Sequence, residues 1–257
     1  MVSIQHQTVL ITGASSGIGA ACATAFAEAG ARLILAARRR ERLQAIAPAL
    51  VEQYGIAVHP VVMDVGDRAQ VEAVLQGLPA DWQAIDVLVN NAGLSRGLEP
   101  LQQGSIEDWD EMIDTNLKGL LYVTRTVLPG MVERGRGHVI NIGSIAGHQP
   151  YPKGNVYCAT KAAVRALSHS LKMDLSGTPV RVSSVDPGLV ETEFSQVRFH
   201  GDQDRAAQVY AHVTPLTPED VAEVVLFCAT RPPHVNLSEI LVLPTDQSSS
   251  TLVHRHS

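Results

Sequence analysis

Short runs of consecutive apolar residues alternate along the chain with longer segments in which apolar residues recur at helical spacing. The apolar runs, which predict buried strands, are 9–11, 33–36, 58–63, 87–89, 138–142, 180–185 and 240–243. The segments between them predict helices over 20–29, 39–54, 68–78, 109–134, 156–175 and 221–229. Strands that are apolar throughout and separated by helices are typical of a parallel sheet covered on both faces. Because such crossovers are right-handed, the pattern predicts an α/β fold with a doubly wound parallel sheet, the Rossmann type of three-layer αβα sandwich.

One stretch, Ser195 to Pro215, lacks strong periodicity, is polar and contains Gly201. The chain shows no internal repeat and no low-complexity linker. Long loops in compact domains often cover functional sites. The sequence therefore predicts one domain over 1–257, with an excursion at about 188–215 that covers a site.

Composition narrows the classes of function. The chain has 257 residues, of which 45% are hydrophobic and 18% charged, which is ordinary for a globular protein with a sizeable core. The net charge of -6 argues against a nucleic-acid partner, because neutralising phosphates requires clustered Lys and Arg. A small anionic substrate remains compatible with this charge, since one local arginine can override it.

Cysteines and the chain start indicate the compartment. Cys22, Cys158 and Cys228 form neither a disulfide framework nor a zinc pattern, and we expect Cys22 and Cys228 to be buried. The first six residues do not resemble a signal peptide, and no apolar run is long enough to span a bilayer. We therefore expect a cytoplasmic protein with no membrane contact and no metal.

A glycine-rich turn, Thr12 to Gly19, follows the first predicted strand and precedes a helix. Gly13 permits a tight turn, while Gly17 and Gly19 allow the backbone to approach a pyrophosphate, which the helix N-terminus also favours. A turn of small residues without a ligand has the same letters, but the position after the first strand favours a dinucleotide site. The residues that we expect at the cofactor are Gly13, Ser15, Ser16, Gly17 and Ile18.

The end of the second strand carries Arg38 and Arg39 and no acidic residue. In a dinucleotide fold this point meets the adenosine ribose, where an acid favours NAD and arginines favour a 2′-phosphate. We therefore expect NADP(H), although a solvated basic helix start is the alternative interpretation. Asp64 and Val65 follow the third strand. Asp64 fits either an adenine contact or a helix N-cap, a role that Asp67 could take instead.

Tyr157 and Lys161 are four residues apart, so on a helix they share one face. An ammonium group nearby favours the phenolate and predicts a lowered pKa for Tyr157, which suits an acid/base catalyst. Lys161 could also hold the nicotinamide ribose. Ser144 follows the strand 138–142 and could donate a hydrogen bond to a substrate oxygen. A Tyr/Lys pair is usually only surface amphipathicity, but Ser144 and the glycine turn favour a catalytic group.

Several motifs occur in the order of a known family. They are Thr12 to Gly19, Asn90-Asn91-Ala92-Gly93, Asn116, Ser144 and Tyr157-Cys158-Ala159-Thr160-Lys161. Over nearly its whole length the chain thus resembles the short-chain dehydrogenase/reductases. The resemblance implies a tetrad in which Tyr157 passes the proton, Ser144 positions the carbonyl, Lys161 holds the ribose and tunes Tyr157, and Asn116 holds a relay water. It also implies cofactor contacts from Asn91, Pro187, Gly188, Leu189, Val190 and Thr192.

Longer stretches indicate a subgroup of that family. They are 78–82, 108–116, 127–134, 154–157, 192–199 and 217–221. These stretches are similar to NADP-dependent 3-hydroxy acid dehydrogenases, which act on serine, allo-threonine and 3-hydroxypropionate or malonic semialdehyde, and to sulfoacetaldehyde reductases, which make isethionate. The resemblance implies a small aldehyde or ketone with an anionic end, and its hydroxy acid.

An anionic substrate needs a cation near the nicotinamide. Arg198 in the excursion is the leading candidate, since a guanidinium pairs with carboxylate or sulfonate, although a surface or intersubunit ion pair is equally compatible. Gln149, Tyr151 and Asn155 lie near the active face by sequence, and Gln247 would reach it if the tail folds back. The two glutamines keep a sulfonate open beside a carboxylate.

Two other functions remain open: an NADP-binding regulatory protein without turnover, and a reductase of an uncharged carbonyl such as a sugar, steroid or pteridine. The resemblance also implies a homo-oligomer, a dimer or tetramer, in which the 109–134 and 156–175 helices pair across a two-fold axis.

Overall fold

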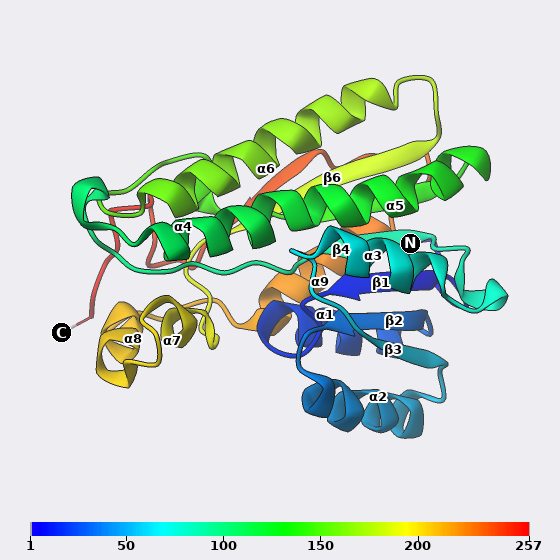
Figure 1. Cartoon of the computed structure of the whole chain (residues 1–257), viewed down its shortest axis with the longest axis horizontal. Coiled ribbons are helices and arrows are strands. Elements are labelled where there is room, and N and C mark those ends of the chain that lie inside the picture. The colour runs from blue at the N-terminus through cyan, green and yellow to red at the C-terminus, as the bar shows by residue number, and fades with distance from the viewer. Residues whose placement is uncertain (1, 257) are drawn as a thin grey trace.

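The computed structural model describes residues 2–256, and the two end residues of the predicted domain 1–257 lie outside the described residues. Seven strands form one parallel sheet in the order β3-β2-β1-β4-β5-β6-β7 (Figure 1). Their bounds are β1 (Thr8–Thr12), β2 (Arg32–Ala37), β3 (Val58–Val62), β4 (Val87–Asn90), β5 (Gly137–Ile142), β6 (Val180–Pro187) and β7 (Glu239–Val242). The strand order reverses direction between β1 and β4, which confirms the predicted doubly wound fold and places a binding crevice at the carboxyl ends of these strands.

Helices cover both faces of the sheet. They are α1 (Gly17–Glu28), α2 (Arg40–Tyr54), α3 (Arg68–Gln76), α4 (Ile106–Ile113), α5 (Leu120–Glu133), α6 (Asn155–Asp174), α7 (Phe194–Arg198), α8 (Gln203–Tyr210) and α9 (Pro218–Ala229). Alternate residues of β1 point to opposite faces: Val9 packs with residues of α1, α2 and α9, and Leu10 packs with residues of α3 and α5. The apolar strands are therefore buried on both sides, as a three-layer sandwich requires.

The predicted helix 109–134 is interrupted. A π-helical turn, Asp114–Gly119, separates α4 from α5. Gly119 packs so closely that a β-carbon there would lie 2.6 Å from Cγ2 of Val65. Wide turns of this kind inside helices frequently mark functional sites, because they redirect side chains that a regular helix would point elsewhere.

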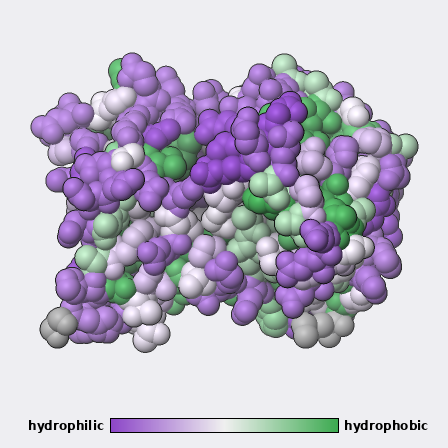
Figure 2. Space-filling model, turned by 90° about the horizontal axis from the view of Figure 1, so that it is seen from below, coloured by the Kyte–Doolittle hydropathy of each residue, from purple (hydrophilic) through white to green (hydrophobic). Residues whose placement is uncertain are grey.

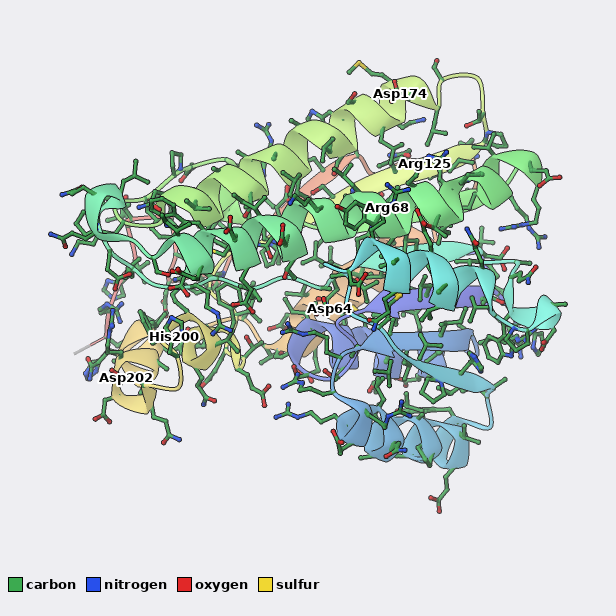
Figure 3. The ribbon with its side chains drawn as sticks, viewed as in Figure 1. Asp64, Arg68, Arg125, Asp174, His200 and Asp202 are labelled. Carbon is green, nitrogen blue, oxygen red and sulfur yellow. The ribbon has the colours of Figure 1, made fainter. Side chains whose placement is uncertain are left out.

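The stretch from Ser195 to Pro215 is not an irregular loop. It contains most of α7 and the whole of α8, and Asp202 begins α8 by accepting a hydrogen bond from the Arg205 amide. His200 and Asp202 lie in the connection between these helices (Figure 3). Helices this short give too few turns for a hydrophobic period to appear in the sequence. We call residues 193–215 the cap segment below.

The C-terminal tail folds back on the domain. Gln247 is buried and forms an isolated bridge with Val253, and Arg255 donates to the carbonyl oxygens of Val209 and Ala211. The face seen in Figure 2 is mostly hydrophilic, with apolar side chains in small scattered groups. Cys22 and Cys228 are buried as expected, and Cys158 is buried too. Within residues 2–256, no helix has the length and apolar character needed to cross a membrane.

Candidate active site

Two adjoining cavities open at the carboxyl ends of the strands. The first has a volume of about 290 Å³ and the second about 230 Å³, and Gly143, Tyr157, Thr192 and Phe194 line both. The first cavity is lined by turns that follow β1, β2, β3 and β4, which is where a doubly wound sheet places its crevice. The predicted cofactor residues along it are Gly13, Ser15, Ser16, Gly17, Ile18, Arg38, Arg39, Asp64, Val65, Asn91, Tyr157, Lys161 and Thr192.

The glycine turn has a conformation that only small residues tolerate. Gly13 has φ +65°, and a β-carbon there would lie 2.8 Å from Nδ2 of Asn91. That amide donates to the carbonyl oxygens of Thr12 at 2.9 Å and Gly13 at 3.3 Å, which braces the turn from β4. The side chain of Ser16, the N-cap residue of α1, makes no capping bond. The first amides of α1 therefore face the cavity as an anion site.

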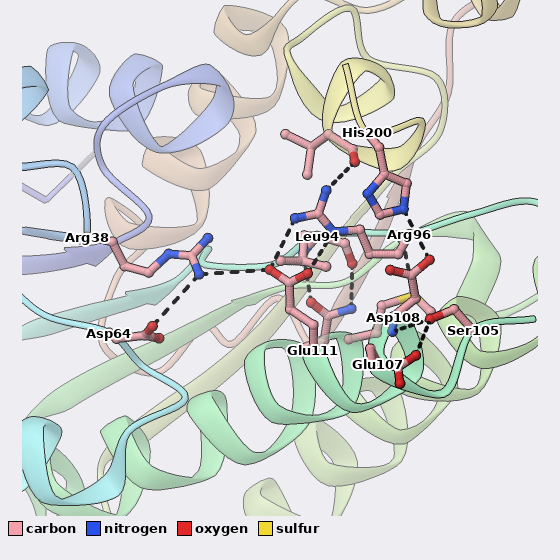
Figure 4. A network of polar contacts seen from close by, with 12 residues as sticks. Arg38, Asp64, Leu94, Arg96, Ser105, Glu107, Asp108, Glu111 and His200 are labelled. Atoms are coloured by element: carbon pink, nitrogen blue, oxygen red, sulfur yellow. Dashed lines mark hydrogen bonds and ion pairs between the residues drawn. The ribbon is translucent and has the colours of Figure 1, made fainter. Parts of the chain in front are cut away.

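Two arginines border the far end of the first cavity. Arg38 is half exposed, with Nη1 at 3.7 Å from Asp64 Oδ2 and 3.9 Å from Glu111 Oε1 (Figure 4). Arg39 lies over the glycine turn, where Nε and Nη2 donate to Ser15 Oγ at 3.1 and 2.9 Å. Both guanidiniums thus lie where a phosphate beside the turn could reach them.

The structure distinguishes the two interpretations of Asp64, a helix N-cap and an adenine contact. Asp67 is the N-cap of α3, and its side chain accepts a hydrogen bond from the Gln70 amide. Asp64 lies in the cavity wall, where Oδ1 accepts from the Gly66 amide at 2.9 Å and Oδ2 faces Arg38. Asp64 therefore has no capping role and remains a candidate for the adenine contact.

Tyr157 and Lys161 lie on one face of α6, as their spacing predicts, but their electrostatics differ from the expectation. Burial raises the pKa of Tyr157, and the positive charge of Arg198 and a hydrogen bond with Ser144 only partly counter it. Nζ of Lys161 lies 6.0 Å from the tyrosine ring centre and donates to the Ile142 carbonyl oxygen at 2.9 Å. The prediction that Lys161 lowers the pKa of Tyr157 is therefore wrong for the protein without cofactor, because burial dominates and Arg198 is the effective cation.

Lys161 itself is buried, which lowers its pKa to about 8 in spite of the opposing charge of Asp186. Asp186 belongs to an ion network on the far side of Lys161. His148 Nε2 lies 2.7 Å from Asp186 Oδ2 and 3.2 Å from Glu239 Oε1, and Glu239 also pairs with Arg165. Such a group of ligand atoms could hold a metal ion, but Glu239 is already paired with Arg165 and Asp186 is already bound by His148 and Ser184.

Asn116 projects from the π-helical turn and is buried. Its Oδ1 accepts from the Leu94 amide at 2.8 Å, and its Nδ2 donates to the Leu94 carbonyl at 2.8 Å and to Thr160 Oγ1 at 3.1 Å. A β-carbon at Gly93 would lie 3.2 Å from Asn116 Oδ1 and 3.6 Å from Lys161 Nζ. The absence of a side chain at Gly93 therefore leaves space beside both the Asn116 amide and the Lys161 ammonium.

The second cavity contains the predicted anion partner. Arg198 Nε donates to Ser95 Oγ at 3.0 Å, and Nη2 donates to the Tyr151 hydroxyl at 2.7 Å. Its third nitrogen, Nη1, makes no hydrogen bond within residues 2–256. The guanidinium carbon is 5.3 Å from the centre of the Tyr157 ring, and Ser144 lines the same space. A cation with one nitrogen that makes no hydrogen bond in the described residues thus lines the same cavity as the phenol and hydroxyl that could bind a carbonyl.

Two predicted substrate residues lie elsewhere. Gln149 is exposed, and its Oε1 accepts from the Ser250 amide at 3.1 Å. Asn155 begins α6, where its Nδ2 donates to the Glu99 carbonyl oxygen at 3.1 Å. Neither side chain lines either cavity, so these two assignments are corrected. Both residues were assigned to the substrate because they are near the active-site residues in the sequence. In the structure a backbone group binds each side chain instead.

The segment Pro187–Val190 lines the second cavity and not the first, whereas Thr192 lines both. Gln247 reaches the second cavity from the tail, as predicted. Its Oε1 accepts from the Leu189 amide at 2.8 Å and its Nε2 donates to the Ser249 carbonyl at 3.2 Å. The amide of Gln247 therefore supports the backbone that forms the cavity wall.

Several lining residues that were not predicted come from the cap segment. Phe194 packs edge-on against Tyr157 with ring centres 5.5 Å apart, and the Tyr210 hydroxyl donates to the Val190 carbonyl at 2.9 Å. Ser195 and Val209 line the second cavity beside them. No sequence signal identified these residues, because α7 and α8 are too short to show a helical period.

Comparisons with known proteins agree with this geometry. Residues 7–203 match the family model described as short chain dehydrogenase. The chain is 54% identical to NADP-dependent 3-hydroxy acid dehydrogenase YdfG of Salmonella typhi over 96% of this chain and 99% of that protein. It is 44% identical to NADP-dependent 3-hydroxy acid dehydrogenase of Schizosaccharomyces pombe over 99% of each. A solved structure, the closed form of serine dehydrogenase complexed with NADP+, matches with a TM-score of 0.91 and 51% identity, covering 97% of this chain and 100% of that chain.

Proposed function

The chain belongs to the short-chain dehydrogenase family, and on that premise we propose that it is an NADP(H)-dependent oxidoreductase of small 3-hydroxy acids and their carbonyl forms. The observation that carries the substrate class is the unused Nη1 of Arg198 in the cavity that holds Ser144 and Tyr157. A guanidinium in that place selects an anionic end on the substrate.

The residues of the first cavity fit a dinucleotide with a 2′-phosphate. The first amides of α1 would hold the pyrophosphate, and Arg38 and Arg39 the 2′-phosphate. Asp64 and Val65 would contact the adenine. Bound NADP(H) supplies or accepts the hydride. Further cofactor contacts fall to Asn91, Tyr157, Lys161, Pro187, Gly188, Leu189, Val190 and Thr192.

The protein's own groups handle the proton. Ser144 Oγ would hold the substrate oxygen, and the Tyr157 hydroxyl would donate its proton to that oxygen during reduction. Burial raises the pKa of Tyr157, so the hydroxyl carries the proton that it would donate. Lys161 and Asn116, which both lie beside Gly93, would return a proton to Tyr157 from solvent.

The arrangement favours a carboxylate over a sulfonate. A sulfonate has three acceptor oxygens, and Gln149 and Gln247 were its expected donors. Gln149 lies outside the cavity, and the amide of Gln247 is bound to backbone on both sides. Apart from hydroxyl groups, the remaining side-chain donor is Arg198, whose one nitrogen without a hydrogen bond in the described residues matches the smaller demand of a carboxylate.

Steady-state NADPH oxidation with malonic semialdehyde, sulfoacetaldehyde and the uncharged propionaldehyde tests this proposal. Arg198→Ala should raise KM for malonic semialdehyde by about 30-fold, the size expected for a hydrogen bond to a charged group. KM for propionaldehyde should change less than about threefold. Arg205→Ala is the matched control, because Arg205 lies on the same segment but outside both cavities. An equal loss for charged and uncharged aldehydes would rule out the anion site, and a lower KM for sulfoacetaldehyde than for malonic semialdehyde would make the substrate a sulfonate.

We also propose that the protein forms a homo-oligomer through α4, α5 and α6. Leu121 and Val132 on α5 are about two-fifths exposed and Met173 on α6 is 69% exposed, and burying these apolar side chains between subunits would stabilise an oligomer. Sedimentation at micromolar concentration should show a dimer or tetramer, and a monomer would contradict the proposal.

A further inference from the structure

A carboxylate from the cap segment is bound by two arginines of the cofactor end of the molecule. Glu193 precedes α7, and its Oε2 lies 3.0 Å from Nη1 of Arg39. Its two oxygens lie 2.7 and 2.8 Å from Nη1 of Arg42, one turn into α2. The contact joins residues more than 150 positions apart in the chain, so it holds the start of the cap segment against α2.

This carboxylate lies at the end of the first cavity that the adenosine ribose would reach. Glu193 lines that cavity together with Arg39, Ser15 and Ser16. The same guanidinium that binds Glu193 also donates to Ser15 Oγ and to Ser16 Oγ, so it is already anchored over the glycine turn. The Glu193 carboxylate thus binds the arginine that the proposed function assigns to a 2′-phosphate.

The Glu193 carboxylate carries a full negative charge at neutral pH. Partial burial acts to raise its pKa, but hydrogen bonds and charges from Arg39 and Arg42 outweigh burial and hold the pKa below its usual range. A 2′-phosphate and this carboxylate would therefore be two anions competing for one pair of cations.

We propose that Glu193 is an internal competitor of the cofactor's 2′-phosphate, and that Arg42 belongs to the phosphate site that the two anions share. The inference rests on the proposed function. Without cofactor, Glu193 holds Arg39 and Arg42. The 2′-phosphate of NADP(H) displaces it, whereas NAD(H), which has a hydroxyl there, leaves it in place.

Displacement of Glu193 would affect the substrate cavity, because Glu193 is only five residues before Arg198. The other end of α7 has separate anchors on the α4 side. Arg96 Nη1 donates to the Val197 carbonyl at 2.5 Å, and the Gly97 amide donates to the Arg198 carbonyl at 2.9 Å. Release of Glu193 would therefore free the start of α7 and leave its end attached.

A second connection leads to the same helix. Glu111 pairs with Arg96 at 2.7 Å, and its Oε1 also lies 3.9 Å from Nη1 of Arg38 (Figure 4). The two arginines assigned to the 2′-phosphate thus both have a carboxylate partner connected to α7. Occupation of this subsite is expected to change how the start of α7 is held, while Arg96 and Gly97 still hold its end.

Nucleotide affinity tests the competition. Dissociation constants of NADPH and NADH can be measured from nicotinamide fluorescence for the wild type and Glu193→Gln. We expect Glu193→Gln to tighten NADPH about fivefold and to change NADH less than twofold, as for loss of one partly exposed charge interaction. Arg42→Ala should weaken NADPH about fivefold and NADH less than twofold. Glu191→Gln is the control, since Glu191 is an exposed neighbouring carboxylate that does not line either cavity.

Amide hydrogen exchange tests the displacement. Adenosine 2′,5′-bisphosphate carries the 2′-phosphate but no nicotinamide, and 5′-AMP lacks the 2′-phosphate. The bisphosphate should speed exchange across residues 193–199 in the wild type, and 5′-AMP should not. In Glu193→Gln exchange should already be fast and unaffected by either nucleotide.

The proposed function and the competition by Glu193 would be contradicted by different results. If wild-type protein does not bind NADPH, the proposed function is wrong. If it binds NADPH but Glu193→Gln and Arg42→Ala have no selective effect, or if the bisphosphate leaves exchange of 193–199 unchanged, the competition is wrong and the proposed function stands.

Discussion

Two constraints require glycine at position 13: the left-handed backbone conformation and the lack of space for a β-carbon. Replacing Gly13 by alanine, beside the same replacement at Gly55, tells the two constraints apart. Gly13 has φ +65°, and a β-carbon there would lie 2.8 Å from Asn91 Nδ2 and 2.9 Å from the Ala92 Cα. Gly55, after α2, has nearly the same φ of +66°, and a β-carbon there would have nothing within 4 Å. The pair of variants therefore shares one strained backbone conformation and differs in the clash.

The magnitudes follow from these contacts. A left-handed alanine costs about 1 kcal/mol, which the lower entropy of the unfolded chain partly offsets, so Gly55→Ala should lose at most about 1 kcal/mol. Gly13→Ala must in addition move Asn91 or the backbone at Ala92, which typically costs a further 1–3 kcal/mol, or about 2 kcal/mol here. The same movement disturbs the brace of the glycine turn. We expect NADPH affinity to fall at least about tenfold for Gly13→Ala and to stay unchanged for Gly55→Ala.

Urea unfolding measures the stabilities, and NADPH fluorescence titration measures the affinities. The reasoning is refuted if Gly13→Ala is no less stable than Gly55→Ala. It is also refuted if the Gly55 variant, far from the cavity, weakens NADPH as much as the Gly13 variant.

Two further predictions concern the catalytic group. Ser144→Ala should lower the rate of hydride transfer by about 10²-fold, because Ser144 would bind the reacting oxygen. NADPH affinity should change little, because Ser144 lines only the second cavity. An unchanged single-turnover rate in stopped-flow measurements would contradict this. The buried Lys161 has its pKa lowered to about 8, so between pH 8 and the higher pKa of the unfolded chain the folded state holds fewer protons, and stability should rise with pH. Between pH 8 and 9.5 the free energy of unfolding should rise by about 2 kcal/mol because of Lys161, and this rise should be absent in Lys161→Met. Urea unfolding at each pH measures it. Equal dependence of unfolding free energy on pH in both proteins would show that Lys161 does not cause the rise.

The strands could be predicted because the sheet is buried on both faces. Residues such as Val9 and Leu10 point to opposite layers, yet both are apolar, so β1 appears in the sequence as an unbroken run. The glycine turn and the Tyr157/Lys161 pair were also predictable, since local geometry alone places their members together.

Other features depend on contacts that a sequence does not show. The π-helical turn at Asn116 has the same apolar pattern as a regular helix, so 109–134 was predicted as one element. The short helices of the cap segment have no readable period. The Gln149 side chain accepts a hydrogen bond from a backbone amide and the Asn155 side chain donates one to a backbone carbonyl oxygen, and only the folded chain brings these backbone groups near. The pKa of Tyr157 depends on burial, which its spacing from Lys161 does not reveal.

The central claim is that the Tyr157 hydroxyl donates the proton to a carbonyl beside the cofactor. Single-turnover oxidation of NADPH by malonic semialdehyde with Tyr157→Phe tests it most directly, because phenylalanine keeps the ring packed against Phe194 and removes only the hydroxyl. We predict a rate at least about 10³-fold below the wild type with an NADPH dissociation constant within about threefold. Turnover close to the wild-type rate would show that another group supplies the proton.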